Sequence, residues 1–210
     1  VPCCPSIDCP SIFALSVSDA SHIASIMHST NVSDSTLRDQ HECVEFSAIN
    51  SSLVVSILYP SGSDLEFFGN IEGQSIYLDF LESLRSKGFN FSSFDFSPLL
   101  EAGSLLFDGA FLADRFSSVG SVLNSSSHPD VLATTTSVVS KAASISGSDV
   151  FSALARLKEI KVHVKNLLSH NNIFIFPTVA PLYTVNEVLA NPIDLNSNIG
   201  HYSYFANVLD

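Results

Sequence analysis

One stretch of this sequence, residues 97–123, is apolar around most of a helical circumference. Ser97 and Pro98 form a favourable N-cap and first-turn pair, and large apolar side chains follow at Leu99, Leu100, Leu105, Leu106, Phe107, Phe111, Leu112, Phe116, Val119 and Val122. A helix of this kind has to be buried on several sides. Other elements must therefore surround it, and Arg115 within it is a cation that is costly to bury without a partner.

Segments with strand and helix character alternate along the chain. Strands are predicted at 53–59, before Pro60-Ser61-Gly62, at 89–96 as a bulged edge strand, and at 173–176 as a fully apolar central strand. Helices are predicted at 19–27 with Asp19 as N-cap, at 74–87 with Gly88 as C-cap, and at 129–143, 148–168, 184–190 and from about 198, and residues 29–50 are a predicted loop. This alternation predicts the α/β class.

Composition excludes several classes of protein. The 210 residues are 46% hydrophobic and only 14% charged, which is unlike a disordered chain. The net charge of −12 disfavours nucleic acid and anionic membranes as partners, and no apolar run reaches the length of a membrane span. We therefore expect a soluble, cytoplasmic domain. The basic residues within 148–168 are expected to form a solvated face, with a contact from Arg156 to Glu159.

The cysteines and histidines do not have metal-site spacing. The four cysteines are Cys3, Cys4, Cys9 and Cys43. Their arrangement contains no C-x2-C pair, and a chain of this length needs no disulfides for stability. His163 and His170 are too far apart along one predicted helix to bind the same metal ion comfortably. The pattern favours reduced, partly buried thiols and indicates neither a metal nor a cofactor.

Serine is over-represented, yet no serine stands in a recognisable nucleophile motif. The chain has no G-x-S-x-G elbow, no Gly-rich phosphate loop and no convincing pair of carboxylates. Residue pattern alone therefore indicates no catalytic residues.

Four blocks of the sequence resemble the amidase-signature family, and within it the allophanate hydrolases of urea breakdown. They are VPCCPSIDCPSIFAL at 1–15, LEFFGN at 65–70, DFSPLLEAGSLLFDGAFLADR at 95–115 and IFPTVAPLYTVNEVLANPIDLNSNIGHYSYFANVLD at 175–210. The last block is the most specific, because few families combine P-T-x-x-P, E-V-x-A-x-P-I-x-L-N-S and Y-x-x-F-x-N in that order. The resemblance covers the whole chain.

This resemblance implies a partial domain. The family holds its Ser–cis-Ser–Lys triad in a Gly/Ser-rich segment upstream of the V-P-x-C block, and nothing here matches that segment; Lys87 and Lys141 stand in the wrong context to replace the lysine. The chain begins at Val1 and ends at Asp210 within a helical pattern. We expect residues 1–210 to be one partial domain, truncated at both ends, that resembles the second half of an amidase α/β/α sandwich with a mixed sheet and contains no catalytic residue.

Substrate recognition is what the resemblance implies for this half. Allophanate hydrolases hold the substrate carboxylate with an Arg eight residues after a Tyr, in a motif like L-L-Y-x-G-x-x-x-A-x-R. The corresponding residues here include Phe107, Gly109 and Arg115. A planar guanidinium binds a carboxylate in a bidentate manner, which suits Arg115 to this role. The alternative is a structural ion pair of Arg115 with Asp108 or Asp114.

Two positions depart from the family pattern. Phe107 lacks the Tyr hydroxyl, a loss of roughly 1.5–3 kcal/mol for a bond to a charged ligand, and Asn70 replaces the usual Asp. The first hypothesis is the substrate-binding half of an amide hydrolase acting on allophanate, with the triad outside this chain. The second is an inactive remnant or a binding or scaffold module of the same family. A third, a subunit resembling glutamyl-tRNA amidotransferase, is disfavoured by the Arg115 motif.

The expected partners follow from these hypotheses. They are a small carboxylate or amide substrate and the missing N-terminal amidase half or another chain. A half-domain exposes apolar surface, so self-association into a homo-oligomer is also expected. Tyr183, Asn196 and Tyr202 match family positions, and we expect them to serve packing and loop hydrogen bonds.

Overall fold

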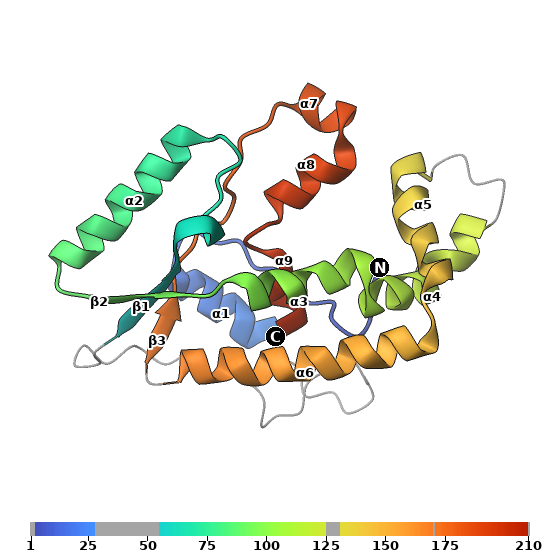
Figure 1. The fold of residues 1–210 in the computed structure, drawn as a ribbon, viewed down its shortest axis with the longest axis horizontal. Helices are drawn as coiled ribbons and strands as arrows, with labels where there is room; N and C mark the ends of the chain where they lie inside the picture. Colours follow the sequence, from blue (N-terminus) through green and yellow to red (C-terminus); the bar gives the residue numbers. More distant parts are fainter. Residues whose placement is uncertain (1–2, 28–54, 125–130, 170, 210) are drawn as a thin grey trace.

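A computed structural model describes residues 3–27, 55–124, 131–169 and 171–209 (Figure 1). The helices are α1 Val17–Met27, α2 Ile71–Ser86, α3 Ser97–Asp108, α4 Ala110–Asn124, α5 Ala133–Val139, α6 Gly147–Leu168, α7 Val185–Ala190, α8 Pro192–Ile199 and α9 Tyr204–Leu209. Single 3-10 turns occur at Gly62–Asp64 and Ser140–Ser144. The predicted loop at 29–50 and Cys43 lie outside the described residues.

The described strands form one small parallel sheet. Its strands are β1 Ser56–Pro60, β2 Asn90–Phe94 and β3 Asn172–Phe174, in the order β2-β1-β3. β1 pairs in parallel with both neighbours, Ile57 opposite Phe91 on one side and Ile173 on the other. Successive strand residues point to opposite faces, and Ile57 and Leu58 are both buried, so β1 is covered on both faces. The α/β class is confirmed.

The strands differ from the predictions in placement. β2 lies at an edge, as predicted. β3 was predicted to be central, but it is the other edge of the three described strands, and its Ile173 is 43% exposed. All the described pairings are parallel, so the antiparallel part of a mixed sheet is not among them.

The apolar segment 97–123 is not one continuous helix. It divides at Gly109 into α3 and α4; in Figure 1 α3 continues from β2 to the right of the sheet, and α6, which contacts α3, runs along the lower edge of the view. Phe96 and Leu99 are fully buried where α3 begins. Phe96, rather than Ser97, stands at the N-cap position. The prediction that this segment is buried on several sides is confirmed by its contacts with α6 and α9.

Hydrogen bonds of polar side chains set the helix boundaries. Ser16, rather than Asp19, caps α1: its hydroxyl accepts from the Asp19 N–H at 3.1 Å. Ser146 and Thr184 cap α6 and α7 in reciprocal capping boxes. α2 begins at Ile71 because Asn70 accepts from the Gly73 N–H at 3.0 Å. Gly88 follows α2 with φ of +89°, the left-handed conformation that ends helices.

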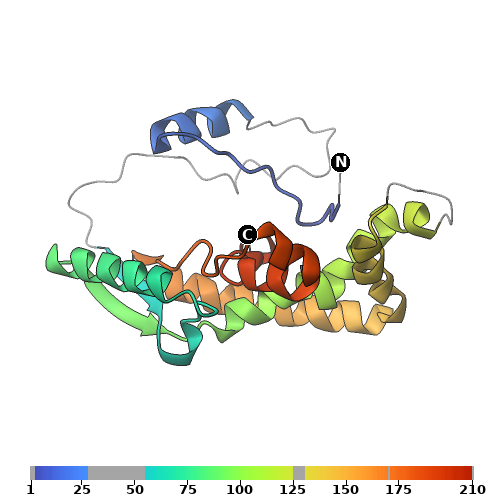
Figure 2. The ribbon, with the colours of Figure 1, turned by 90° about the horizontal axis from the view of Figure 1, so that it is seen from above.

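The large apolar residues of α2 differ in burial. Tyr77 and Leu81 are buried, whereas Ile76 and Phe80 are 62% and 48% exposed. Figure 2 shows α1 standing away from the helices and strands of the rest of the described chain. α1 has no buried residue, and the preceding apolar run is also exposed, with Phe13 at 94%.

Candidate functional site

The break between α3 and α4 brings Phe107 and Arg115 together. Gly109, with φ −132° and ψ −149°, connects the two helices, and a Cβ there would lie 2.8 Å from Leu105 Cδ2 and 3.1 Å from Leu105 Cα. Only glycine allows this close approach without a shift of Leu105. The guanidinium carbon of Arg115 lies 5.2 Å from the centroid of the Phe107 ring, a cation–π contact.

The Arg115 guanidinium is not neutralised by a carboxylate of the described chain. The two alternatives named above have other partners: Asp108 lies 3.9 Å from Lys141 Nζ, and Asp114 accepts from the Ser6 hydroxyl at 2.7 Å. Arg115 is half-buried, and its Nε is a buried donor without a hydrogen-bond acceptor among the described residues. An unsatisfied buried donor costs free energy, so this cation is suited to an anion supplied from elsewhere.

Phe107 also packs against the C-terminal helix. Its ring centroid lies 4.8 Å from that of Tyr204, and the Tyr204 hydroxyl donates to the Asn196 carbonyl at 2.6 Å. Burial raises the pKa of Tyr204, which keeps its hydroxyl protonated. Tyr204 lies against two glycines: a Cβ on Gly200 would be 1.9 Å from its Cζ, and one on Gly103 would be 3.2 Å from its Cβ. Sequence reasoning missed Tyr204; the tyrosine within Y-x-x-F-x-N was the one it noted.

The N-terminal segment also reaches this site. Cys4 is 2% exposed, and its thiol lies 3.5 Å from the Phe111 carbonyl on α4. The Arg115 charge lowers the pKa of the Cys4 thiol, but burial raises it more, and the thiol therefore stays neutral. Cys3 and Cys9 are exposed free thiols, and the described residues contain no His/Cys/Asp/Glu group able to hold a metal ion. Of these three cysteines, only Cys4 is buried, so the expectation of partly buried thiols holds for Cys4 and not for Cys3 or Cys9.

Asn70, the second departure from the family pattern, has a structural role. Besides capping α2, it donates through Nδ2 to the Ala180 carbonyl at 2.8 Å. That bond ties the start of α2 to the Pro177–Pro181 turn after β3. An aspartate could cap the helix but could not donate, so the amide fits this contact.

Three other matched residues form structural hydrogen bonds. The Tyr183 hydroxyl accepts from the Asn198 amide at 2.9 Å, and Asn196 donates to the Pro192 carbonyl at 2.6 Å. Tyr202 is buried, and its hydroxyl accepts from the Glu66 N–H at 2.8 Å. Tyr202 and Tyr183 thus bond to loop backbone and to a neighbouring side chain, as expected, whereas the bond of Asn196 lies within α8.

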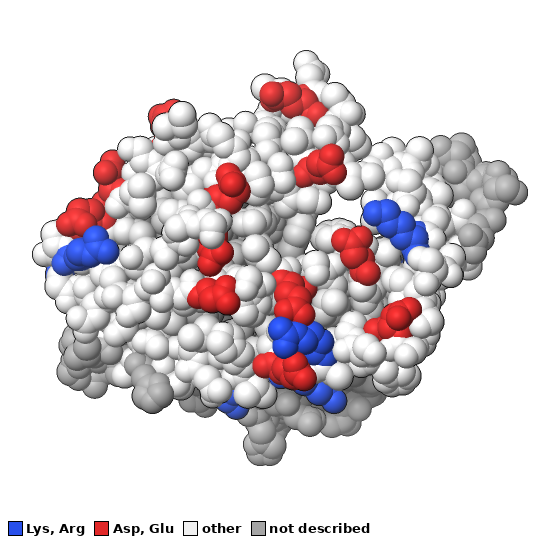
Figure 3. Space-filling view, viewed as in Figure 1, with Lys and Arg blue, Asp and Glu red and all other residues white. Residues whose placement is uncertain are grey.

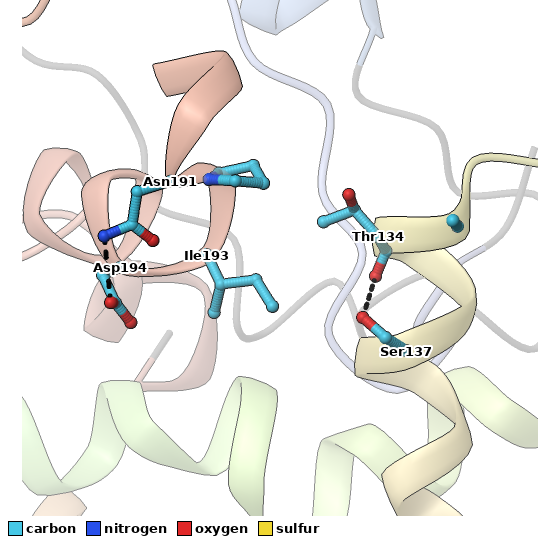
Figure 4. A pocket seen from close by; sticks show the side chains of 7 residues that line it. Thr134, Ser137, Asn191, Ile193 and Asp194 are labelled. Carbon is cyan, nitrogen blue, oxygen red and sulfur yellow. Dashed lines mark hydrogen bonds between the residues drawn. The ribbon is translucent and has the colours of Figure 1, made fainter. Parts of the chain in front are cut away.

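Two grooves lie away from Arg115. One, of about 500 Å³, is formed by α2 and the turn after β3, with Tyr77, Phe80 and Val179 among its lining residues. The other, of about 470 Å³, lies between α5 and α8, where Asn191 binds Asp194 and Ser137 bonds to Thr134 (Figure 4). Neither groove is lined by a cation, so neither matches a carboxylate substrate.

The charges on the described surface do not form a basic patch on the face seen in Figure 3, where acidic groups are spread among few basic ones. Arg156 on α6 binds Glu101 on α3 at 2.7 Å and Glu159 at 2.8 Å, which confirms the predicted contact within α6. None of the described helices is long and apolar enough to cross a membrane.

Comparison with known proteins agrees with the resemblance seen in the sequence. No protein-family model matches the chain. Over its full length the chain is 28% identical to urea amidolyase of Saccharomyces cerevisiae and 25% identical to that of Lachancea kluyveri, and it spans 11% of each of these proteins.

Solved structures give the same result for the fold. A variant of Kluyveromyces lactis allophanate hydrolase matches with a TM-score of 0.84 and 27% identity, over 100% of this chain and 34% of that one. The urea amidolyase of the same organism matches with a TM-score of 0.67 and 26% identity, over 74% of this chain and 9% of that one. Over its full length, in sequence and in fold, the chain is therefore similar to the allophanate hydrolase amidase region of these proteins.

Proposed function

We propose that this chain is the substrate-binding half of an amide C–N hydrolase that acts on allophanate in urea degradation. The residues that break the amide bond belong to a part of the polypeptide outside these 210 residues, or to another chain. In this role the protein works in the cytoplasm and needs no cofactor. Arg115 holds the carboxylate of the substrate, and the segment from Phe107 to Gly109 shapes the place where that carboxylate binds.

The observation that carries the proposal is the state of Arg115. Its guanidinium lies over the Phe107 ring at 5.2 Å, its Nε is buried without an acceptor, and no carboxylate of the described chain forms an ion pair with it. A guanidinium presents parallel N–H donors to a planar carboxylate, and a site of lower dielectric strengthens such a bond. The aromatic ring restricts the guanidinium without supplying a negative charge, so the cation is retained for the ligand.

The test is a calorimetric titration with malonate, an unreactive dicarboxylate similar in shape to allophanate. The chain with Arg115 should bind malonate, and Arg115→Ala should lose about tenfold or more in affinity, the equivalent of one charge-assisted hydrogen bond. Arg115→Lys should recover only part of the affinity, because an ammonium cannot bind a carboxylate as a fork. Arg85→Ala is the matched control, since Arg85 is an exposed arginine paired with Glu82. Equal binding by Arg115→Ala and the parent chain would refute the proposed role.

Ammonia release from allophanate tests whether the residues that break the amide bond lie outside this chain. The 210-residue chain alone should release none. Addition of an upstream amidase segment from an allophanate hydrolase should restore release, and Arg115→Ala should reduce what is restored. Turnover by the chain alone would show that the catalytic residues lie within these 210 residues.

The second candidate function is an inactive binding or scaffold module, which the lost hydroxyl at Phe107 favours. The Phe107 ring contacts the Tyr204 ring and the Arg115 guanidinium, and it supplies no hydroxyl for a ligand. Under this hypothesis malonate still binds at Arg115, but complementation by an upstream segment gives no ammonia, even after Phe107→Tyr. Ammonia release by the complemented Phe107→Tyr variant alone would show that one substitution removed the activity.

A further inference from the structure

The segment Cys3–Asp8, which we name the N-terminal bracket, folds back on itself. The Cys4 carbonyl accepts from the N–H groups of Ile7 and Asp8 at 2.9 and 2.8 Å. The Asp8 carboxylate accepts in return from the N–H groups of Cys3 and Cys4 at 2.6 and 3.0 Å. These reciprocal bonds satisfy the backbone of the turn and hold Cys4 in a defined place.

Two contacts attach the bracket to the helical turn of α4 that ends at Arg115. Cys4 places its sulfur 3.5 Å from the Phe111 carbonyl, one turn before Arg115. Ser6 donates to the Asp114 carboxylate from its hydroxyl at 2.7 Å and from its N–H at 3.3 Å. Both contacts therefore fall within the helical turn that leads to Arg115, and they join residues more than a hundred positions apart in sequence.

The bracket also determines the chemistry next to the guanidinium. Cys4 is 2% exposed and interacts with Arg115. Asp114 is held by Ser6, and the Asp8 carboxylate is occupied by backbone donors, so the acidic groups of this region are engaged elsewhere. A buried, neutral thiol excludes water from one side of the cation without neutralising its charge.

We propose that the N-terminal bracket positions Arg115 and that Cys4 is a positioning residue for the carboxylate-binding cation. Together with the Phe107 ring, the thiol confines the guanidinium and leaves its charge uncompensated. The identity of the anion rests on the proposed function, but the ordering of Arg115 by the bracket does not.

The ordering is tested without any ligand. The chain has four arginines, so the Nε–H groups give a simple NMR spectrum, and Arg115→Lys identifies the signal of Arg115. Hydrogen exchange at this Nε–H should be roughly tenfold faster in Cys4→Ala and in Ser6→Ala, as for a tenfold shift in a local opening equilibrium. Cys4→Ser, which keeps a small neutral polar atom, should remain close to the parent chain. Cys9→Ala, at an exposed cysteine, is the matched control.

Malonate titration then tests the consequence for binding. Cys4→Ala should weaken malonate binding severalfold, Cys4→Ser should restore it, and Cys4→Asp should abolish it by pairing with the cation. Ser6 lies on the surface, so Ser6→Ala keeps the test valid if Cys4→Ala fails to fold.

The outcomes separate the two proposals. Faster Arg115 exchange in the variants together with no malonate binding to the parent chain would reject the proposed function and keep the positioning role. Unchanged Arg115 exchange in both Cys4→Ala and Ser6→Ala would overturn the positioning role, whatever the malonate affinity.

Discussion

At the scale of single residues, the aromatic rings around His201, just before α9, affect its pKa. His201 packs against Phe68, Phe96 and Tyr202, with ring centroids 5.2, 6.0 and 4.7 Å away. Its Nε2 is buried without a hydrogen-bond partner among the described residues. Burial lowers the pKa of His201, and the nearby Glu66 opposes this shift only in part. The imidazole is therefore neutral in the folded chain.

This burial predicts a pH dependence of stability. An unfolded histidine has a pKa of about 6.5, above that of the folded state, so the unfolded chain binds more protons as the pH falls below that value. The free energy of unfolding should therefore decrease from pH 7.5 to pH 5. Urea unfolding at the two pH values measures the decrease, which should be smaller in His201→Gln. His22→Gln, at an exposed histidine, is the control. An equal decrease in His201→Gln would exclude His201 as its source.

The missing hydroxyl of Phe107 makes a second prediction at this scale. Phe107→Tyr should strengthen malonate binding by about 1.5–3 kcal/mol if the new hydroxyl reaches the bound carboxylate. Calorimetry measures the change, and Phe116→Tyr on α4 is the control for an added hydroxyl. An unaltered affinity would show that the carboxylate does not lie beside this ring.

At the scale of elements, the junction of α3 and α4 is the feature that assembles the site. Each helix is apolar on a broad face, and α3 packs against α4, α6 and α9. In a continuous helix through Gly109, Arg115 would lie about two turns from Phe107 and point in a different direction. Because the chain changes direction at Gly109, Phe107 and Arg115 form a cation–π contact although they are eight residues apart in sequence.

Substitution of this glycine tests the role of the junction. Gly109→Ala forces its Cβ against Leu105 and should destabilise the chain by about 1–3 kcal/mol, as overpacking does. It should also weaken malonate binding, because Arg115 is displaced relative to Phe107. Gly147→Ala is the matched control, since nothing lies within 4 Å of a Cβ there. Thermal unfolding and calorimetry give the two readouts; equal effects of both substitutions would refute this role.

At the scale of the whole molecule, large apolar side chains remain exposed over several elements. They include Phe13 and Leu15 before α1, Ile76 and Phe80 on α2, and Leu182, Val185 and Leu189 around α7. Apolar surfaces of this extent usually mark interfaces. The chain also spans only 34% of the matching allophanate hydrolase structure, which agrees with a surface that the remainder of such a domain would cover.

This surface predicts self-association of the isolated chain. Light scattering should show dimers or larger species at micromolar concentration, because removal of apolar area from water drives association. Ile76→Lys with Phe80→Glu, on the exposed side of α2, should shift the distribution toward monomer. Glu72→Lys with Asp79→Lys alters charge on the same helix without removing apolar area and serves as the control. A monodisperse monomer of the parent chain would contradict the prediction.

The local predictions succeeded where one short-range interaction decides the outcome. The left-handed Gly88 after α2 and the contact between Arg156 and Glu159 follow from neighbouring residues. The start of α2 was predicted three residues too late, because Asn70 was not recognised as its N-cap. The burial of Tyr77 on α2 was missed too, because it depends on packing against Phe67.

The sequence by itself determined the alternation of strands and helices, the need to bury residues 97–123, and the spacing of Phe107 and Arg115, since these depend on the order of side chains along the chain. Only the tertiary structure decided that the segment divides at Gly109, that Asp108 and Asp114 bind other partners, and that Cys4 lies beside Arg115. The physical reason is distance along the chain: contacts such as Cys4 with Phe111 are formed by the packing of remote segments, and no local pattern encodes them.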